Sequence, residues 1–248
     1  MIKQEIIDLK REFERIKKMG YIKTTRNGPT GIGKTFEDLI GKKEDTLDTP
    51  DYHGIEIKTK RGYSQSYITL FNVTPKGKNE FEIKHLCNAY GYPDKILKEK
   101  RVLAVSVQAN STTLVSNRFL FKLNIDYKNE KIFLSIMDRN MNILHKDTYW
   151  EFKQIKERLE KKLPVLAYIK ACTKTIEHIN YYKYYDIQFY KLKSFHTFLK
   201  LLEQGKIRIT FKIGVFREGP RKGEIHDRGT GFEIREIDIN ELFIKVST

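Results

Sequence analysis

The chain has 248 residues, with 47 Lys and Arg against 32 Asp and Glu and a formal charge of +15. This length suffices for one large domain or two small ones, and the positive excess favours a polyanionic partner. The longest apolar run, residues 165–169, is far shorter than the ~20 residues of a membrane-spanning helix. Cys87 and Cys172 have neither disulfide-framework nor zinc spacing. We therefore expect a soluble, reduced, cytoplasmic protein without a secretory signal or a membrane segment.

Hydrophobic periodicity and turn residues predict a mixture of helices and strands in the first half of the chain. Apolar residues recur at three- and four-residue steps from Ile2 to Ile16, and Gly20 follows them. Helices are predicted at 2–19, 34–40 and 81–90 and strands at 54–59, 67–73 and 101–108, with a Gly-rich turn at 28–33.

The second half begins with a predicted hairpin, in which 118–126 and 131–137 flank a polar turn. A helix marked by Phe152, Ile155 and Leu159 precedes a strongly apolar strand at 163–172. A helix marked by Leu192, Phe195, Leu199 and Leu202 ends at Gly205, and strands at 206–216 and 231–237 enclose a long basic loop. The pattern predicts a single unit over 1–248, of α/β or α+β class around a mixed sheet.

Residues 28–35 match the phosphate-loop pattern G-x-x-x-x-G-K-[ST] at every position. A phosphate loop should follow a buried apolar strand, yet residues 21–27 contain only Tyr21 and Ile22 as apolar residues. The helix after it is short, and no apolar run ends in a magnesium-binding Asp. A Gly-rich helix entry is therefore favoured over nucleotide hydrolysis.

Residues 51–59 carry a stronger chemical signal. In a strand, alternate side chains share a face, so Glu56 and Lys58 point together while Ile55 and Ile57 point into a core. Residues 52–54 can bend Asp51 back toward Glu56. Two carboxylates beside one ammonium suit metal-assisted phosphodiester hydrolysis, in which Mg²⁺ is held by one or two carboxylates and keeps several waters. The alternative is an edge strand with a solvated charged face.

Seven segments, taken in order, resemble the MvaI/BcnI family of type II restriction endonucleases, in the MutH-like branch of the PD-(D/E)XK nuclease superfamily. They are residues 30–40, 50–59, 69–71, 149–150, 161–163, 181–184 and 222–230. The resemblance implies a restriction-endonuclease-like fold, with a central mixed β-sheet flanked by helices and two lobes that form a DNA-binding cleft. We expect a catalytic lobe at roughly 1–175 and a recognition lobe at roughly 176–248.

The resemblance also implies an enzyme that cuts both strands of a short, pseudosymmetric, GC-containing duplex site of the CC-N-GG type. Asp51 and Glu56 would bind Mg²⁺, Lys58 would be the catalytic lysine, and Glu37 would be an auxiliary acid. The protein would act as a monomer that reorients on double-stranded DNA, with a companion DNA methyltransferase protecting host sites.

The basic loop is the main candidate for DNA contact. His226, Asp227 and Arg228 are expected to read bases, because Arg pairs with guanine and Asp accepts from cytosine. The other predicted DNA-contacting residues are Arg217, Arg221, Lys222, Lys212 and Asn72. Thr210 replaces an acid found in relatives of the resembled family, and Lys212 and Asn72 occupy positions that vary within it. The Tyr-rich segment 181–185 is expected to pack in a core or between lobes.

Two further functions stay open from the sequence. One is a MutH-like repair nickase that cuts a single strand and depends on a partner. The other is a DNA-binding protein whose nuclease site is vestigial, although the presence of Asp51, Glu56 and Lys58 argues against it.

Overall fold

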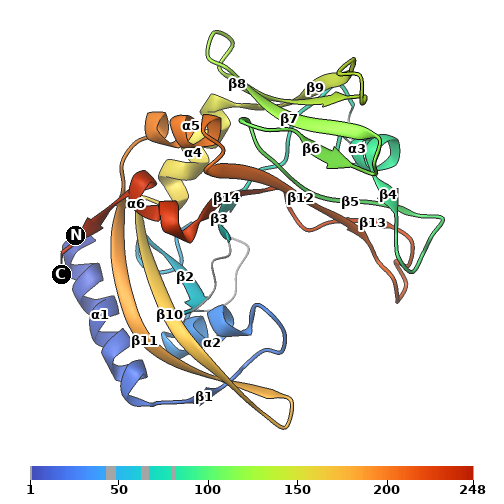
Figure 1. Cartoon of the computed structure of the whole chain (residues 1–248). Coiled ribbons are helices and arrows are strands. Elements are labelled where there is room, and N and C mark those ends of the chain that lie inside the picture. Colours follow the sequence, from blue (N-terminus) through green and yellow to red (C-terminus); the bar gives the residue numbers. More distant parts are fainter. Residues whose placement is uncertain (1, 43–48, 63–66, 80–81, 248) are drawn as a thin grey trace. The chain divides into compact units, whose positions relative to one another are not determined.

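The computed structural model (Figure 1) describes residues 2–42, 49–62, 67–79 and 82–247. The chain forms two compact units that interleave along the sequence. The first unit comprises 1–66, 159–194 and 239–248, and the second comprises 67–158 and 195–238. The expected lobe boundaries do not coincide with these units, and the division of labour between catalysis and recognition stays a prediction.

The first unit is built on a mixed sheet with the strand order β1-β11-β10-β2, and β15 pairs with β11. Only the pair β2 and β10 is parallel among the described strands of this sheet. Its elements are α1 (Ile2–Lys18), β1 (Ile22–Lys23), α2 (Gly31–Leu39), β2 (Ile55–Arg61), β10 (Val165–Ile176), β11 (Ile179–Leu192), α6 (Ile239–Leu242) and β15 (Phe243–Val246).

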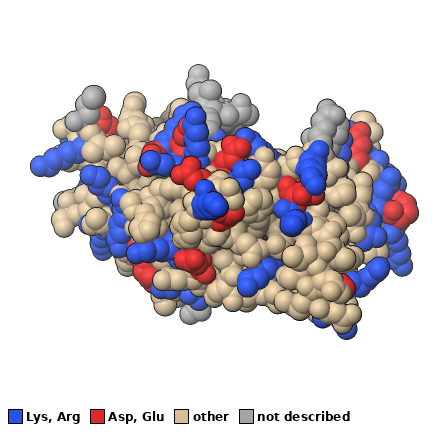
Figure 2. All heavy atoms as spheres, turned by 90° about the horizontal axis from the view of Figure 1, so that it is seen from above, with Lys and Arg blue, Asp and Glu red and all other residues tan. Residues whose placement is uncertain are grey.

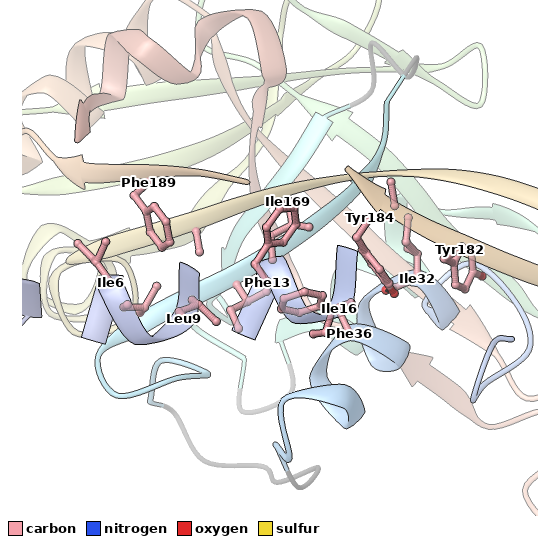
Figure 3. Packing of buried hydrophobic residues seen from close by; sticks show 14 of the residues in the cluster. Ile6, Leu9, Phe13, Ile16, Ile32, Phe36, Ile169, Tyr182, Tyr184 and Phe189 are labelled. Carbon is pink, nitrogen blue, oxygen red and sulfur yellow. The ribbon is translucent and has the colours of Figure 1, made fainter. Parts of the chain in front are cut away.

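Helices α1 and α2 pack on one face of this sheet, and the hydrophobic core of the unit lies between the helices and the sheet (Figure 3). The periodic residues Ile6, Leu9, Phe13 and Ile16 are all buried there, whereas Ile2 is exposed. Burial of each large apolar side chain stabilises the fold by about 1.5–3 kcal/mol. The apolar stripe predicted for the first helix therefore anchors α1 against β10 and β11.

The second unit contains two further sheets, ordered β3-β14-β12-β5-β4, with β13 on β12, and β6-β7-β8-β9. Their strands are β3 (Tyr67–Asn72), β4 (Tyr92–Pro93), β5 (Arg101–Val107), β6 (Thr113–Val115), β7 (Phe119–Asp126), β8 (Lys131–Met137), β9 (Ile143–Glu151), β12 (Ile207–Val215), β13 (Ile225–Asp227) and β14 (Gly231–Arg235). The helical elements are α3 (Glu82–Tyr90), α5 (Phe195–Glu203) and a 3-10 turn (Glu236–Asp238), and α4 (Phe152–Lys162) spans the boundary to the first unit.

The structure confirms the predicted mixed α/β class and most of the elements. Helix α2 begins at Gly31, inside the Gly-rich turn, and Leu192 ends β11 instead of starting a helix. Within the basic loop, residues 225–227 form the short strand β13. The elements missed from the sequence are β6, β9, β11, α6 and β15, two very short strands, and the 3-10 turn that replaces the end of the strand predicted at 231–237.

Strand β11 was missed because a β-bulge disrupts its alternation. The register with β10 skips one residue of β11 between Asp186 and Tyr184. Before the bulge Tyr182 and Tyr184 face the core, and after it Phe189 does. A bulge shifts the inward-facing set by one residue, so no single period-two pattern runs through the strand.

Among the described helices, none is long and apolar enough to cross a membrane.

Candidate functional site

Strand β2 places Glu56 and Lys58 on the face of the sheet opposite α1. Ile55 and Ile57 point into the core, as the alternation predicts. Lys58 Nζ donates to Glu56 Oε1 over 2.6 Å, and Glu56 is only 1% exposed. Strand β2 is an edge strand of its sheet, as the alternative interpretation of residues 51–59 supposed. Its charged face is not solvated, however, because Glu56 is buried.

A tight turn brings Asp51 alongside the strand. Tyr52 and Ile55 exchange backbone hydrogen bonds across His53 and Gly54, which have positive φ angles of 43° and 87°. Asp51 Oδ2 then accepts a hydrogen bond of 3.0 Å from the backbone N–H of Ile57. Asp51 therefore returns to the strand that carries Glu56, as predicted.

Glu37 reaches the same cluster from α2. Burial raises the pKa of Glu37, and the negative charge of Asp51 raises it further, while Lys34 and Lys58 oppose the shift. Burial likewise raises the pKa of Glu56, against the opposing effect of Lys58. The four predicted site residues thus belong to one electrostatic cluster, in which Glu37 and Glu56 are partly desolvated.

Lys162, at the end of α4, is a member of this cluster that the sequence reasoning missed. Its Nζ lies 3.5 Å from Glu56 Oε2, so Glu56 faces two lysines. Leu166 of β10 stands beside Glu56 in the parallel register, which brings the residues just before β10 close to this carboxylate. The sequence does show Lys161 and Lys162 directly before the apolar strand β10. It does not show that β10 pairs with β2, and this pairing is what brings Lys162 to Glu56.

The donor set fits a hard divalent cation. Glu56 Oε2 is buried and makes no hydrogen bond, although Lys162 Nζ is nearby. Such an oxygen is available to a cation, and Mg²⁺ typically takes one or two carboxylates and retains waters. Within the described ranges, no group of three or more His, Cys, Asp or Glu is arranged to hold a metal ion. Asp51 and Glu56 are the two carboxylates of the cluster that would hold such a hydrated ion.

The phosphate-loop pattern has a different structural role. Strand β1 before it has only two residues, and α2, which begins within the pattern at Gly31, has nine. The Lys34 ammonium is paired with Asp38 on the same helix. The segment is a Gly-rich helix entry, as the sequence context favoured.

In the second unit, β13 divides the three expected base-reading residues between two sides. His226 and Arg228 line a groove of about 690 Å³ together with Lys212 and Arg217. Asp227 lines a separate groove of about 580 Å³. Its carboxylate accepts a hydrogen bond of 2.8 Å from the backbone N–H of Gly229. Strand alternation explains the split, because residues 226 and 228 share one face and residue 227 takes the other.

The other predicted DNA-contacting residues have mixed surroundings. Arg217 binds Asp94 through Nη2 at 2.8 Å, and the hydrogen bond from Arg217 holds the pKa of Asp94 well below its usual range. Arg221 pairs with Glu224 at 2.7 Å and stacks on Phe216. Lys222 and Asn72 are exposed. The sequence reasoning missed Asp94, which holds the Arg217 side chain at this groove.

The Tyr-rich segment is a core element. Tyr182 and Tyr184 are fully buried, and the Tyr184 hydroxyl donates to the Ile32 carbonyl over 2.7 Å. The expected packing role is confirmed for these two residues.

Comparisons with known proteins identify the class of this α/β protein. The model of the MvaI/BcnI restriction endonuclease family matches residues 10–243. The chain therefore belongs to this family and is a type II restriction endonuclease, as the resemblance implied. Restriction endonucleases generally use a divalent metal ion.

Two similar solved structures are of the restriction endonuclease MvaI. The complex of MvaI with its cognate DNA substrate has a TM-score of 0.89 and 33% identity, covering 96% of this chain and 96% of MvaI. MvaI in the absence of DNA has a TM-score of 0.63 and 32% identity, covering 98% and 96% of the two chains. The comparison with curated proteins gave no match.

Proposed function

We propose that this enzyme hydrolyses phosphodiester bonds in both strands of a short, GC-containing duplex DNA site, of the CC-N-GG type, with Mg²⁺ as cofactor. The observation that carries the proposal is the buried Glu56 carboxylate, with Lys58 on one oxygen and no hydrogen bond on the other. MvaI, at 33% identity, is known in complex with a cognate DNA substrate.

Each residue of the cluster has a separate role in this proposal. Asp51 and Glu56 bind the cation, which when bound stabilises the charge that develops on the attacked phosphate and lowers the pKa of a coordinated water. Lys58 Nζ lies 2.6 Å from Glu56 Oε1, where it orients the attacking water or, in its neutral amine form, accepts the proton of that water. Glu37 adds a third carboxylate from α2.

We further propose that the second unit supplies the DNA-reading surface, with Lys212, His226 and Arg228 in one groove and Asp227 on the other face of β13. Arg221 and Lys222 contact phosphates, and Arg217, which lines the first groove, and Asn72 are further DNA contacts. The enzyme acts as a cytoplasmic monomer that reorients on its site to cut the second strand, and a companion methyltransferase protects the host DNA.

The direct test is to incubate the purified protein with unmethylated plasmid DNA, with and without Mg²⁺, and to sequence the fragment ends. Discrete double-strand fragments that need metal are expected, and their ends define the site and the cut position. Nicks in one strand would favour the MutH-like repair nickase. Intact DNA that is nevertheless bound would favour a vestigial site.

The variant Lys58→Ala tests the chemistry separately from binding. We expect cleavage to fall by about 10²- to 10⁴-fold, the usual contribution of a positioned acid–base group. DNA affinity should change little, because the proposed reading surface lies in the second unit. Lys17→Ala, on the exposed side of α1, is the matched control and should cleave normally. Undiminished cleavage by Lys58→Ala would rule out the assignment.

A further inference from the structure

A buried carboxylate lies in the middle of the larger sheet of the second unit. Glu233 belongs to β14, which runs between β3 and β12. Its neighbours Phe232 and Ile234 point into the core and are fully buried, so Glu233 points to the opposite, polar face of the sheet. It is nevertheless only 5% exposed.

Side chains from both neighbouring strands converge on this carboxylate. Arg208 donates to Oε2 from Nε at 3.1 Å and from Nη2 at 2.9 Å, and the Thr210 hydroxyl donates to the same oxygen at 2.9 Å. Oε1 pairs with Lys212 Nζ at 2.7 Å and accepts from Thr69 at 3.3 Å. Both oxygens of Glu233 are therefore occupied by donors.

The two cations of this cluster differ in their freedom. The Arg208 guanidinium is held in two ways, by its paired bonds to Glu233 and by the Tyr67 ring 3.3 Å away. The side chain of Lys212 is 35% exposed and lines the groove that also contains His226 and Arg228. An ammonium has three donors, so Lys212 can bind Glu233 and still donate into the groove.

Two small residues in the lining of this groove leave room for a ligand near Lys212. Ala104 and Gly214 line it, and an added Cβ at Gly214 would meet only the His226 carbonyl, at 4.0 Å. Small residues around a fixed donor allow a flat polar edge to approach. Burial raises the pKa of Glu233, but the hydrogen bonds from Lys212, Arg208 and Thr210 lower it by more. The net pKa lies below that of an ordinary Glu, so the acid is ionised at neutral pH.

Stability alone does not account for such a cluster. Buried ion pairs are often no more stabilising than apolar residues of similar volume, because desolvation offsets the attraction. A charged network that is fully satisfied does, however, hold its members in one arrangement. The arrangement at Glu233 ends in one partly exposed donor that faces a groove.

We propose that Glu233 is a positioning residue for sequence recognition, which holds Lys212 Nζ in the groove so that it donates to the major-groove edge of a guanine. Lysine recognises guanine through O6 and N7, and a donor held in one place discriminates among bases better than a mobile one. The inference rests on the proposed function, because it assumes that the second unit reads DNA.

The test compares three single variants, and the double variant Glu233→Gln/Lys212→Met, with the wild type on duplexes in which each base pair of the mapped site is changed in turn. Glu233→Gln keeps the shape of the side chain and removes its charge. Lys212→Met removes the donor itself. Glu151→Gln is the control, because Glu151 is also paired with a lysine, Lys76 at 2.8 Å, in the same unit.

We expect Glu233→Gln and Lys212→Met to lose discrimination at the same G·C pair, each by about 10-fold or more in kcat/KM. The loss should appear mainly in KM, and the double variant should lose no more than Lys212→Met alone. Glu151→Gln should discriminate like the wild type. Thermal unfolding of each variant separates these effects from loss of the fold.

Three results would overturn the inference. Glu233→Gln could lower cleavage equally on all duplexes, it could unfold at a lower temperature with unchanged discrimination, or Lys212→Met could discriminate normally. Normal discrimination by Lys212→Met would overturn the inference even if the Glu233→Gln variant does not fold. Failure of the proposed function is distinct, because the wild type would then cleave no duplex.

Discussion

The side chain of Glu56 lies where a carboxylate is poorly solvated, and two lysines only partly compensate. Burial raises its pKa, the charge of Asp51 adds to the effect, and Lys58 and Lys162 act in the opposite direction. Burial also raises the pKa of Glu37. Both acids therefore retain protons at a higher pH than exposed glutamates do, which affects both metal binding and stability.

The pH dependence of cleavage should report these raised pKa values. A cation needs ionised carboxylates, so the cleavage rate should fall as the pH drops, starting at a higher pH than an ordinary Glu pKa of 4.5 would give. Because protons and metal compete for the same oxygens, more Mg²⁺ should move the midpoint to lower pH. Single-turnover rates across a pH series at two Mg²⁺ concentrations provide the measurement. A midpoint independent of Mg²⁺ would contradict the assignment.

Glu56→Gln should stabilise the metal-free protein at neutral pH while abolishing cleavage. Because the pKa of Glu56 is raised in the folded state, the free energy of unfolding of the protein falls as the pH rises through that pKa. At neutral pH the ionised Glu56 therefore destabilises the fold. A neutral isostere avoids this, with an expected gain of roughly 0.5–2 kcal/mol. Thermal unfolding without metal measures it. Glu151→Gln is the contrast, since Lys76 lowers the pKa of Glu151 and no gain is expected. A lower Tm for Glu56→Gln would refute the argument.

At the scale of elements, the placement of α2 decides whether Glu37 belongs to the site. A nine-residue helix is not stable by itself in water, so packing must hold it. The Phe36 ring lies 5.2 Å from Tyr184 and 6.5 Å from Phe13, measured between ring centroids. The Tyr184 hydroxyl binds the Ile32 carbonyl. These contacts from α1 and β11 orient the helix face that carries Glu37.

Gly31→Ala should displace the start of this helix. A Cβ at residue 31 would lie 2.3 Å from the Arg26 carbonyl oxygen and 2.8 Å from the Tyr182 hydroxyl, and the first of these is backbone. We expect a loss of about 1–3 kcal/mol, as for overpacked cores, together with slower cleavage because Glu37 moves. Chemical denaturation and cleavage rates test both effects.

Gly33→Ala is the control for the backbone clash. Its nearest neighbour would be the Thr59 hydroxyl at 3.1 Å, a side chain that can move. The gain in helix propensity, about 1 kcal/mol, should then maintain or raise stability. Equal stability losses in the two alanine variants would mean that the close approach at Gly31 is not what positions α2.

For the whole molecule, the formal charge of +15 is the dominant feature. In Figure 2, Lys and Arg side chains are interspersed with Asp and Glu and do not gather in one patch. Such a distribution attracts a polyanion over a broad area, whereas sequence is read by a few groups held in place.

DNA binding should therefore depend steeply on salt. Each neutralised phosphate adds about −0.9 to the slope of log K against log salt concentration, so six to ten contacts reduce affinity by about 10³- to 10⁵-fold between 50 and 200 mM. Titrations with a duplex in the absence of metal measure the slope. Lys222→Ala, which removes one exposed cation, should reduce its magnitude by about 1. A flat response would contradict an electrostatic contribution to binding.

The sequence by itself determined the local features of this protein. Periodicity placed α1 and the hairpin of β7 and β8, and alternation put Glu56 and Lys58 on one face of β2. The ordered motifs identified the family that the comparisons then showed. The periodic features depend on residues close together in the chain, where the periods of helix and strand determine which side chains share a face.

Only the tertiary structure decided which distant residues meet. Lys162 reaches Glu56 because β10 pairs in parallel with β2, and Glu233 meets Thr69 because β14 pairs with β3. The bulge in β11 reverses which residues of that strand face the core. Such contacts depend on strand order and register, which are set by the packing of whole sheets, so no local pattern in the sequence reveals them.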